Sequence, residues 1–288
     1  MSTAIIVGTG PAGISAALYL KRANIDVTLI GKRGGALEKA DSVENYFGFA
    51  EPVSGKDLAE AGMSNALRLG CRIVEDEVVS IGYNQSLTVF TKGGSYEGDV
   101  VVLATGAARN TPNIEGVREL EGKGVSYCAV CDAFFYRKKD VAVLGSGEYA
   151  LHEATELAAV ASSVTVLTNG SPVTADFPPT MQIESRRIRR LVSSETGTLG
   201  GVELEDGTFL PLAGVFVALG VASSGDLARK LGAATENGRI VVNEKMETNI
   251  PGLYAAGDCV GGLLQISKAV SDGAIAATEA IKYLRSKK

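Results

Sequence analysis

Residues 4–13 read Ala-Ile-Ile-Val-Gly-Thr-Gly-Pro-Ala-Gly, and this stretch decides the fold of the chain. A short apolar strand leads into a G-x-G-x-x-G loop, and a helical pattern of apolar residues follows from Ile14 to Leu20. Another predicted strand covers residues 26–30. A loop in this β-α-β context is typical of a dinucleotide site, because its glycines allow a tight turn, close approach of a pyrophosphate and helix packing. The N-terminus of the helix then faces the phosphate charge.

A second unit of the same kind occurs near the middle of the chain. The sequence predicts a strand over residues 140–144, a glycine-rich loop over 145–150 and a helix after it. Such self-similarity predicts an α/β fold with two Rossmann-like domains. A strand, a turn and a long helix near the C-terminus are expected to complete the first domain, so the second is inserted into it. The predicted domains are residues 1–112 with 246–288 and residues 113–245, and residues 109–118 are expected to form a linker.

Composition and charge narrow the function classes. The 288 residues are 45% hydrophobic and 21% charged, as expected of a globular enzyme with a sizeable core. A net charge of −5 argues against nucleic acid as the main partner. No apolar run reaches the roughly 20 residues that span a bilayer, and the N-terminal residues lead into a strand and not into a signal peptide. We therefore expect a cytoplasmic protein with no membrane or nucleic-acid partner.

The most informative chemical feature is the pair Cys128 and Cys131, in the run Tyr-Cys-Ala-Val-Cys-Asp. Two cysteines three residues apart at a helix start can cycle between dithiol and disulfide, and the helix start stabilises the thiolate. A zinc site would need further ligands, but only Cys71, Cys259 and His152 remain, in no paired spacing. The sequence therefore favours redox chemistry and predicts no metal site.

Several stretches, taken in this order, resemble the low-molecular-weight thioredoxin reductase family, and the resemblance spans the full chain. No single stretch is specific, but together they are. The resemblance implies FAD in the discontinuous domain, an NAD(P)H-type inserted domain that swings relative to the first, and a homodimer. The matching stretches are residues 8–13, 34–37, 43–49, 104–106, 128–132, 145–150 and 255–258, with Gln265.

The resemblance also implies which residues contact FAD. Glycines of the first loop would hold the pyrophosphate, Asn45 would lie near the isoalloxazine ring, and Val78 would pack by the adenine. Gln265 and Ile266 would lie at the pyrimidine edge of the flavin. The full implied set is Gly8, Gly10, Pro11, Ala12, Gly13, Lys32, Gly35, Leu37, Asn45, Val78, Thr105, Gly106, Gly257, Asp258, Gln265 and Ile266.

For the dithiol, the resemblance implies an order of steps. Cys131 would take electrons from the flavin as the Cys128–Cys131 disulfide opens. Cys128 would then attack the disulfide of a thioredoxin-like partner, and Cys131 would resolve the mixed disulfide. Asp132 would donate a proton to the leaving thiolate. The structural alternative for this carboxylate is an N-cap of the following helix.

Two places depart from the family pattern. The strand over residues 26–30 is followed by Gly-Lys-Arg, without the acid that usually holds a ribose hydroxyl. An NADPH-using member places a cluster of cations after the second strand of the inserted domain, whereas residues 166–170 read Val-Leu-Thr-Asn-Gly. No acid for a free 2′-hydroxyl stands there either, and residues 171–181 hold three prolines and no Lys or Arg. We therefore expect that the glycine loop over 145–150 is retained for helix–strand packing, although the rest of the nucleotide site is missing.

This pattern resembles the ferredoxin-dependent flavin thioredoxin reductases, a branch with the same architecture and a degenerate NADPH site. The resemblance implies that reduced ferredoxin supplies the electrons, since a flavin can accept electrons singly and pass them on in pairs. Two alternatives stay open: an NAD(P)H-dependent thioredoxin reductase with atypical nucleotide contacts, and an oxygen-using dithiol oxidase. The basic run Arg186, Arg187, Arg189 and Arg190 is either a solvated strand edge or a docking surface for an acidic ferredoxin.

Overall fold

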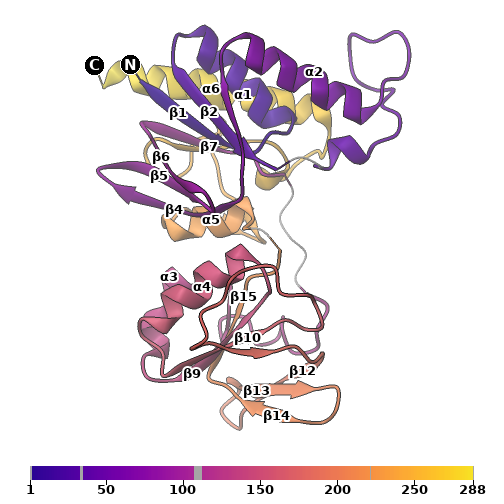
Figure 1. Cartoon of the computed structure of the whole chain (residues 1–288). Coiled ribbons are helices and arrows are strands. Elements are labelled where there is room, and N and C mark those ends of the chain that lie inside the picture. Colours follow the sequence, from indigo (N-terminus) through magenta and orange to yellow (C-terminus); the bar gives the residue numbers. More distant parts are fainter. Residues whose placement is uncertain (1, 33–34, 107–111, 221, 288) are drawn as a thin grey trace. The chain divides into compact units, whose positions relative to one another are not determined.

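The computed structural model describes residues 2–32, 35–106, 112–220 and 222–287 (Figure 1). The chain forms two compact units, one inserted into the other, as the sequence predicts. Arg33, which follows the strand predicted over residues 26–30, and Gly34, which begins the matching stretch 34–37, lie outside the described residues. So do residues 109–111 of the expected linker. The two units are Met1–Arg109 with Ser223–Lys288, and Asn110–Ala222.

The first unit is built on a five-stranded parallel sheet. Its strands are β1 (Thr3–Val7), β2 (Asp26–Gly31), β3 (Arg72–Glu75), β7 (Val100–Leu103) and β18 (Leu253–Ala255). Their spatial order is β18–β7–β1–β2–β3. β7 is buried along its whole length and β1 for all but its first residue, which suits apolar strands in the middle of a parallel sheet. The loops that follow the strands meet at one edge, where doubly wound sheets bind their ligands.

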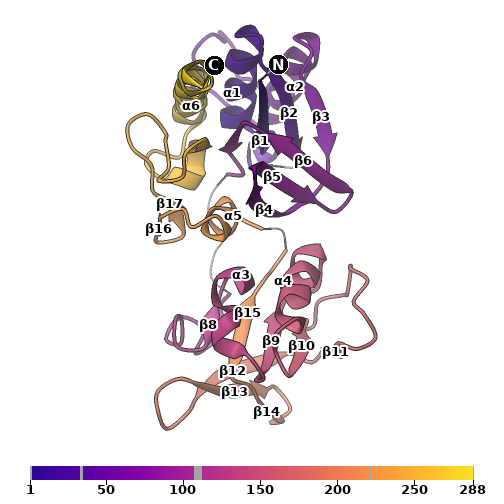
Figure 2. The ribbon, with the colours of Figure 1, turned by 90° about the vertical axis from the view of Figure 1, so that its left-hand side faces the viewer.

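Helices cover one face of this sheet (Figures 1 and 2). Helix α1 (Pro11–Arg22) lies beside the C-terminal helix α6 (Ile266–Ser286). A Cβ on Gly273 of α6 would lie 2.1 Å from the carbonyl oxygen of Ala12, so the close approach of these helices requires glycine there. Helix α2 (Gly55–Arg68) follows the N-cap residue Ser54, whose hydroxyl accepts a hydrogen bond from the backbone N–H of Asp57 at 3.0 Å. A short 3₁₀ turn, η1 (Leu37–Lys39), precedes it.

A smaller antiparallel sheet covers the other face (Figure 1). It consists of β4 (Val78–Asn84), β5 (Ser86–Thr91) and β6 (Gly94–Gly98). Beyond the inserted unit, the chain continues through α5 (Ser224–Lys230) and the hairpin of β16 (Thr235–Glu236) and β17 (Arg239–Ile240).

Residues 223–245 group with the first unit, although the sequence analysis assigned them to the inserted domain. Side chains of α5 explain the grouping. The hydroxyl oxygens of Ser224 and Thr105 lie 2.6 Å apart, and Lys230 Nζ donates to the carbonyl of Val79 at 3.2 Å. These contacts join residues far apart in the chain, so the sequence pattern did not reveal them.

The inserted unit has its own five-stranded parallel sheet, in the spatial order β11–β10–β9–β15–β8 (Figure 2). The second predicted β-α-β unit is confirmed, with helix α4 between β9 and β10. Near the dithiol, the short helix α3 follows β8 and runs into the 3₁₀ turn η2. The bounds are β8 Val125–Ser126, α3 Ala129–Asp132, η2 Ala133–Tyr136, β9 Asp140–Leu144, α4 Glu148–Ala158, β10 Ser163–Leu167, β11 Gln182–Glu184 and β15 Gly214–Val217.

A three-stranded antiparallel sheet completes this unit and carries the basic run. It consists of β12 (Ile188–Ser193), β13 (Leu199–Leu204) and β14 (Phe209–Pro211). Arg186 pairs with Glu184 and Asp206, and Arg189 and Arg190 both pair with Glu203. Hydrogen bonds from Thr208 and Arg186 lower the pKa of Asp206 to about 2. Acidic residues of the same unit thus offset most of the basic run, which supports the strand-edge interpretation over the docking one.

Among the residues described, no helix combines the length and the apolar character that a bilayer crossing requires. Nor does any group of three or more His, Cys, Asp or Glu side chains gather as metal ligands in this part of the chain.

Candidate redox and cofactor site

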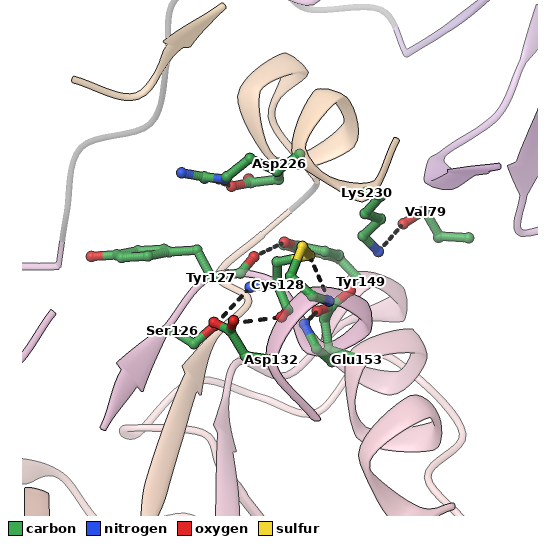
Figure 3. The surroundings of a disulfide bond; sticks show 12 residues. Val79, Ser126, Tyr127, Cys128, Asp132, Tyr149, Glu153, Asp226 and Lys230 are labelled. Atoms are coloured by element: carbon green, nitrogen blue, oxygen red, sulfur yellow. Dashed lines mark hydrogen bonds and ion pairs between the residues drawn. A yellow bond between two sulfur atoms is a disulfide. The ribbon is translucent and has the colours of Figure 1, made fainter. Parts of the chain in front are cut away.

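Cys128 and Cys131 are joined by a disulfide in the inserted unit, with their Cα atoms 5.3 Å apart (Figure 3). Cys128 is the N-cap residue of α3, and its sulfur accepts a hydrogen bond from the backbone N–H of Cys131 at 3.2 Å. The helix start that the sequence predicts beside the pair is present. It directs a donor at the sulfur that would become a thiolate, which is the environment of a reactive cysteine.

The two sulfur-bearing residues differ in exposure. Cys128 is only 3% exposed, whereas Cys131 is exposed. The prediction that Cys128 attacks the disulfide of a partner therefore requires that this residue become accessible during turnover. The division of roles between the two cysteines stays a prediction.

Asp132, the predicted proton donor, is the last residue of α3. Its Oδ2 accepts a hydrogen bond from the hydroxyl of Ser126 at 2.7 Å. Burial, and then the charge of Asp132, raise the pKa of the Tyr136 phenol. The Asp132 side chain makes no capping bond to η2, so the N-cap alternative is not realised. The carboxylate lies on the same short helix as Cys131, and its role as a proton donor stays a prediction.

A second carboxylate beside the dithiol, Glu153 of α4, was not singled out from the sequence. It is 1% exposed, and its Oε2 accepts a hydrogen bond of 2.6 Å from the backbone N–H of Ala129 (Figure 3). Its place on the helix after the second glycine loop is the only signal that the sequence offers, and it does not indicate which element the side chain meets.

The other two cysteines, Cys71 and Cys259, are free and buried, as is common for cysteines that pack as small apolar side chains. Burial raises the pKa of the Cys71 thiol and that of the Cys259 thiol, the latter to about 11. The Cys259 sulfur donates to the carbonyl oxygens of Ala256 and Leu103 at 3.3 and 3.4 Å. Both thiols are therefore protonated and shielded at neutral pH.

Alkylation should distinguish the two kinds of cysteine. After mild reduction at pH 8, we expect iodoacetamide to modify Cys128 and Cys131 and to leave Cys71 and Cys259 unmodified, because the thiolate is the reactive form. Mass spectrometry should find two modified thiols per native chain and four after denaturation. Rapid modification of Cys259 in the native protein would contradict this account of its environment.

The first glycine loop connects β1 to α1 at the predicted cofactor site. Gly8 has φ +120°, and a Cβ there would lie 2.2 Å from the carbonyl oxygen of Ala104. A Cβ on Gly13 would lie 2.0 Å from the carbonyl oxygen of Gly8. In contrast, a Cβ on Gly10 would meet no atom within 4 Å. Gly8 and Gly13 thus serve packing. Gly10 borders open space next to the N-terminus of α1, which fits a pyrophosphate.

No acid follows β2 directly in the sequence, but a carboxylate from another part of the chain lies near the end of this strand. Glu77, from the connection between β3 and β4, pairs with Lys32. The side chain of Glu77 is 9% exposed, and its Oε1 has no hydrogen-bond partner among the described residues. An acid at this edge of a Rossmann sheet normally binds a ribose hydroxyl. The residues present therefore fit the adenosine half of FAD, and Glu77 was not predicted from the sequence because it comes from a connection far from β2 in the chain.

The other predicted FAD contacts lie in the first unit, and two of them are joined by a hydrogen bond. Asn45 Nδ2 donates to Gln265 Oε1 at 3.0 Å, which joins two of them from opposite ends of the chain. The remaining positions are as follows: Pro11 and Ala12 open α1, Gly35 and Leu37 precede and begin η1, Val78 begins β4, Thr105 and Gly106 follow β7, Gly257 and Asp258 begin the 3₁₀ turn η3 (Gly257–Val260), and Ile266 begins α6.

Helix α6 fixes the η3 turn. The backbone N–H of Gly257 donates to Asp272 Oδ2 at 3.0 Å, and Lys268 Nζ donates to the carbonyl of Gly257 at 2.9 Å. Lys268 and Asp272 also pair with each other at 2.6 Å. These two residues position predicted cofactor contacts, and the sequence analysis did not identify them.

The second glycine loop, between β9 and α4, differs from the first. A Cβ on Gly145 would lie 2.2 Å from the carbonyl oxygen of Ala218, so this glycine serves packing, as predicted. Thr174 lies against the loop, since its backbone N–H donates to the carbonyl of Ser146 at 2.8 Å. A Cβ on Gly147 would meet the hydroxyl of Thr174 at 3.3 Å. The proline-containing segment thus contacts the loop that would hold a nucleotide pyrophosphate.

The segment after β10 is also used internally. Asn169 has φ +51°, and its Oδ1 accepts a hydrogen bond from the backbone N–H of Ile188 at 2.7 Å. The Thr168 side chain is 1% exposed. Neither of these side chains carries a positive charge, although the side chain of Arg187 lies against Gly170, with its Nε 3.4 Å from where a Cβ would stand.

The sequence matches one protein-family model over residues 2–273, that of the pyridine nucleotide-disulphide oxidoreductases. Among curated proteins, a thioredoxin reductase of Listeria monocytogenes is 33% identical and covers 99% of this chain and 94% of its own length. A thioredoxin reductase of Peptoclostridium acidaminophilum is 36% identical, with 98% and 96% covered.

Two solved structures are similar over nearly the whole chain. An atypical thioredoxin reductase from Desulfovibrio vulgaris Hildenborough has a TM-score of 0.93 and 36% identity, with 100% of this chain and 99% of that chain covered. A ferredoxin-flavin thioredoxin reductase from Clostridium acetobutylicum has a TM-score of 0.71 and 33% identity, with 99% and 98% covered.

Proposed function

Because the chain belongs to the pyridine nucleotide-disulphide oxidoreductase family, among its thioredoxin reductases, we propose that it reduces a thioredoxin-like protein with electrons from reduced ferredoxin. The enzyme is an oxidoreductase of the thioredoxin-disulfide reductase type, and FAD is its cofactor. The electron donor and the individual partner are the proposed part.

The residues of the chain have separate tasks in this reaction. When bound, FAD supplies the capacity to take up electrons singly and release them in pairs. The residues around Gly10, Lys32 and Asn45 bind and orient it in the first unit. Opening of the Cys128–Cys131 disulfide takes up two electrons and two protons and yields two thiols. Asp132, 2.7 Å from the Ser126 hydroxyl, is placed to hold and release one of these protons.

In the second half of the reaction, the Cys128 thiolate attacks the partner disulfide. A mixed disulfide forms, and one partner sulfur leaves as a thiolate that takes a proton from Asp132. Cys131 then attacks the Cys128 sulfur, which re-forms the disulfide and releases the partner in its dithiol form. Two electrons have moved to the partner, and the enzyme is ready for another cycle.

The observation that carries the choice of donor is the second nucleotide loop. It has no phosphate-binding cation at 166–170, Asn169 is engaged by the backbone of Ile188, and Thr174 lies against the glycines. A 2′-phosphate without Arg or Lys partners loses its charge-assisted hydrogen bonds. The similarity to a structure described as ferredoxin-flavin thioredoxin reductase supports the same choice.

The second candidate is an NAD(P)H-dependent thioredoxin reductase with atypical contacts. Curated relatives named thioredoxin reductase, with 32–36% identity, favour it. It would require the nucleotide to bind with Thr174 displaced from Ser146. Assembly as a homodimer and a cytoplasmic location stay predictions.

A turnover assay separates the candidates. Purified holoenzyme is mixed anaerobically with oxidised thioredoxin and with ferredoxin kept reduced, NADPH or NADH, and thioredoxin thiols are counted over time. We expect turnover with ferredoxin and a rate at least about a hundredfold lower with either nucleotide, equivalent to about 2.7 kcal/mol in transition-state stabilisation. Comparable turnover with NADPH would reject the proposal. Peroxide release from a dithiol in air would instead favour the oxidase.

A further inference from the structure

We propose that Glu153 is a positioning residue for the dithiol: its carboxylate binds the backbone N–H of Ala129, places a negative charge beside Cys128, and thereby makes the dithiol a stronger reductant. The inference rests on the dithiol role in the proposed function and is independent of the electron donor.

The geometry places the carboxylate against the redox turn itself. Ala129 follows Cys128 directly and lies between the two cysteines, and its N–H donates to Glu153 Oε2 at 2.6 Å (Figure 3). Glu153 is 1% exposed on α4, so water screens its interaction with the turn only weakly. A buried charge is costly unless it is hydrogen-bonded or paired, and the Ala129 N–H is one donor that this carboxylate has.

The backbone N–H groups at the start of α3 are divided between two acceptors, a sulfur and a carboxylate. The Cys128 sulfur receives the N–H of Cys131 at 3.2 Å, and Glu153 receives the N–H of Ala129. A donor held by a carboxylate is less able to stabilise a neighbouring thiolate. In addition, a nearby negative charge disfavours a second one. Glu153 therefore limits the thiolate stabilisation that a free helix start would give Cys128.

The effect of Glu153 on the equilibrium between disulfide and dithiol follows from the stoichiometry of reduction. Reduction breaks the Cys128–Cys131 bond and adds two electrons and two protons, and any ionisation of the resulting thiols draws the equilibrium further toward the dithiol. Since Glu153 opposes ionisation, it shifts the equilibrium toward the disulfide. A dithiol held in this way gives up its electrons more readily, as delivery to a partner disulfide requires.

Other titratable groups of this unit near the turn have different partners. Asp132 is bonded to the Ser126 hydroxyl, and the hydroxyl of Tyr149 donates to the carbonyl of Tyr127 at 3.3 Å. His152 precedes Glu153 on α4. Asp132 is bonded to a side chain, whereas Glu153 is bonded to the backbone between the two cysteines, so removal of its charge should act on both sulfurs.

Glu153→Gln tests the proposal because it removes the charge and keeps an oxygen that can accept the Ala129 N–H. Holoenzyme is equilibrated with graded ratios of reduced to oxidised dithiothreitol, and the dithiol fraction is trapped and counted. We expect the equilibrium to shift toward the dithiol about tenfold, or about 30 mV for a two-electron couple. The pH midpoint of Cys128 alkylation should fall in parallel. Glu156→Gln, exposed on the same helix, is the matched control and should change neither value.

Glu153→Asp keeps the charge and should stay closer to the wild-type equilibrium than Glu153→Gln does. An equilibrium unchanged by Glu153→Gln, in protein with normal FAD content and circular dichroism, would overturn the proposal. So would a shift toward the disulfide. If Glu153→Gln does not fold, the proposal rests on Glu153→Asp, for which a tenfold shift would contradict it. No ferredoxin or thioredoxin enters this measurement, so a failed turnover assay and a failed Glu153 role give different results.

Discussion

Replacing Cys131 by serine should abolish thioredoxin reduction, with a loss of at least about a thousandfold, as expected when one member of a reacting pair is removed. Without Cys131 the dithiol cannot form, and no sulfur can resolve a mixed disulfide on Cys128. FAD should remain bound, because the predicted cofactor contacts lie in the other unit. The measurement is thioredoxin thiol formation per flavin, together with the flavin absorbance.

The same variant tests the roles of the two sulfurs. Cys131→Ser mixed with oxidised thioredoxin should accumulate a covalent complex on non-reducing gels, whereas Cys128→Ser should not. The test is informative because Cys128 is buried and Cys131 is exposed. A stable complex with Cys128→Ser alone would reverse the roles. Cys71→Ala, which changes a buried thiol of the first unit, should retain activity within about twofold and serves as the control.

Substitutions in the first glycine loop should separate folding from cofactor binding. In Gly13→Ala, the added Cβ lies 2.0 Å from the carbonyl oxygen of Gly8, so the helix must move away from the sheet. We expect the free energy of unfolding to fall by about 3 kcal/mol or more, at the upper end for overpacking. The protein should also no longer retain FAD. Denaturant unfolding and flavin content measure the two effects.

Gly10→Ala is the matched variant, because a Cβ there meets no atom within 4 Å and the backbone φ is −79°. We expect the free energy of unfolding of the apoprotein to rise by no more than about 1 kcal/mol, because alanine at a compatible backbone conformation restricts the unfolded chain. FAD affinity should fall at least tenfold if the pyrophosphate lies over Gly10. Unchanged affinity would show that the cofactor is held elsewhere.

Much of the fold was predictable because it rests on local patterns. Apolar runs followed by glycine loops located β1 and β9, and both loops lead into helices. The CxxC pair was found because its spacing has a chemical meaning at a helix start. Contacts between distant residues were not predictable: Glu77 replaces the acid missing after β2, and Glu153 reaches the dithiol from α4.

The boundary after the inserted unit was misplaced for the same reason. Residues 223–245 form a helix and a hairpin whose local pattern does not say which unit they join, and contacts such as Ser224 with Thr105 place them in the first unit. The basic run over 186–190 is a case in which the sequence left two interpretations open and the fold favours the strand edge. Its charge is conspicuous in the sequence, but Glu184, Glu203 and Asp206 offset most of it in the fold.

The most direct test of the central claim is a single-turnover measurement of flavin reduction. Oxidised holoenzyme is mixed anaerobically with excess NADPH or with reduced ferredoxin, and flavin absorbance is followed in a stopped-flow instrument. We predict that ferredoxin bleaches the flavin within the turnover time, whereas NADPH leaves it oxidised. Bleaching by micromolar NADPH at the turnover rate would show that the second nucleotide loop is functional and would contradict the proposed donor.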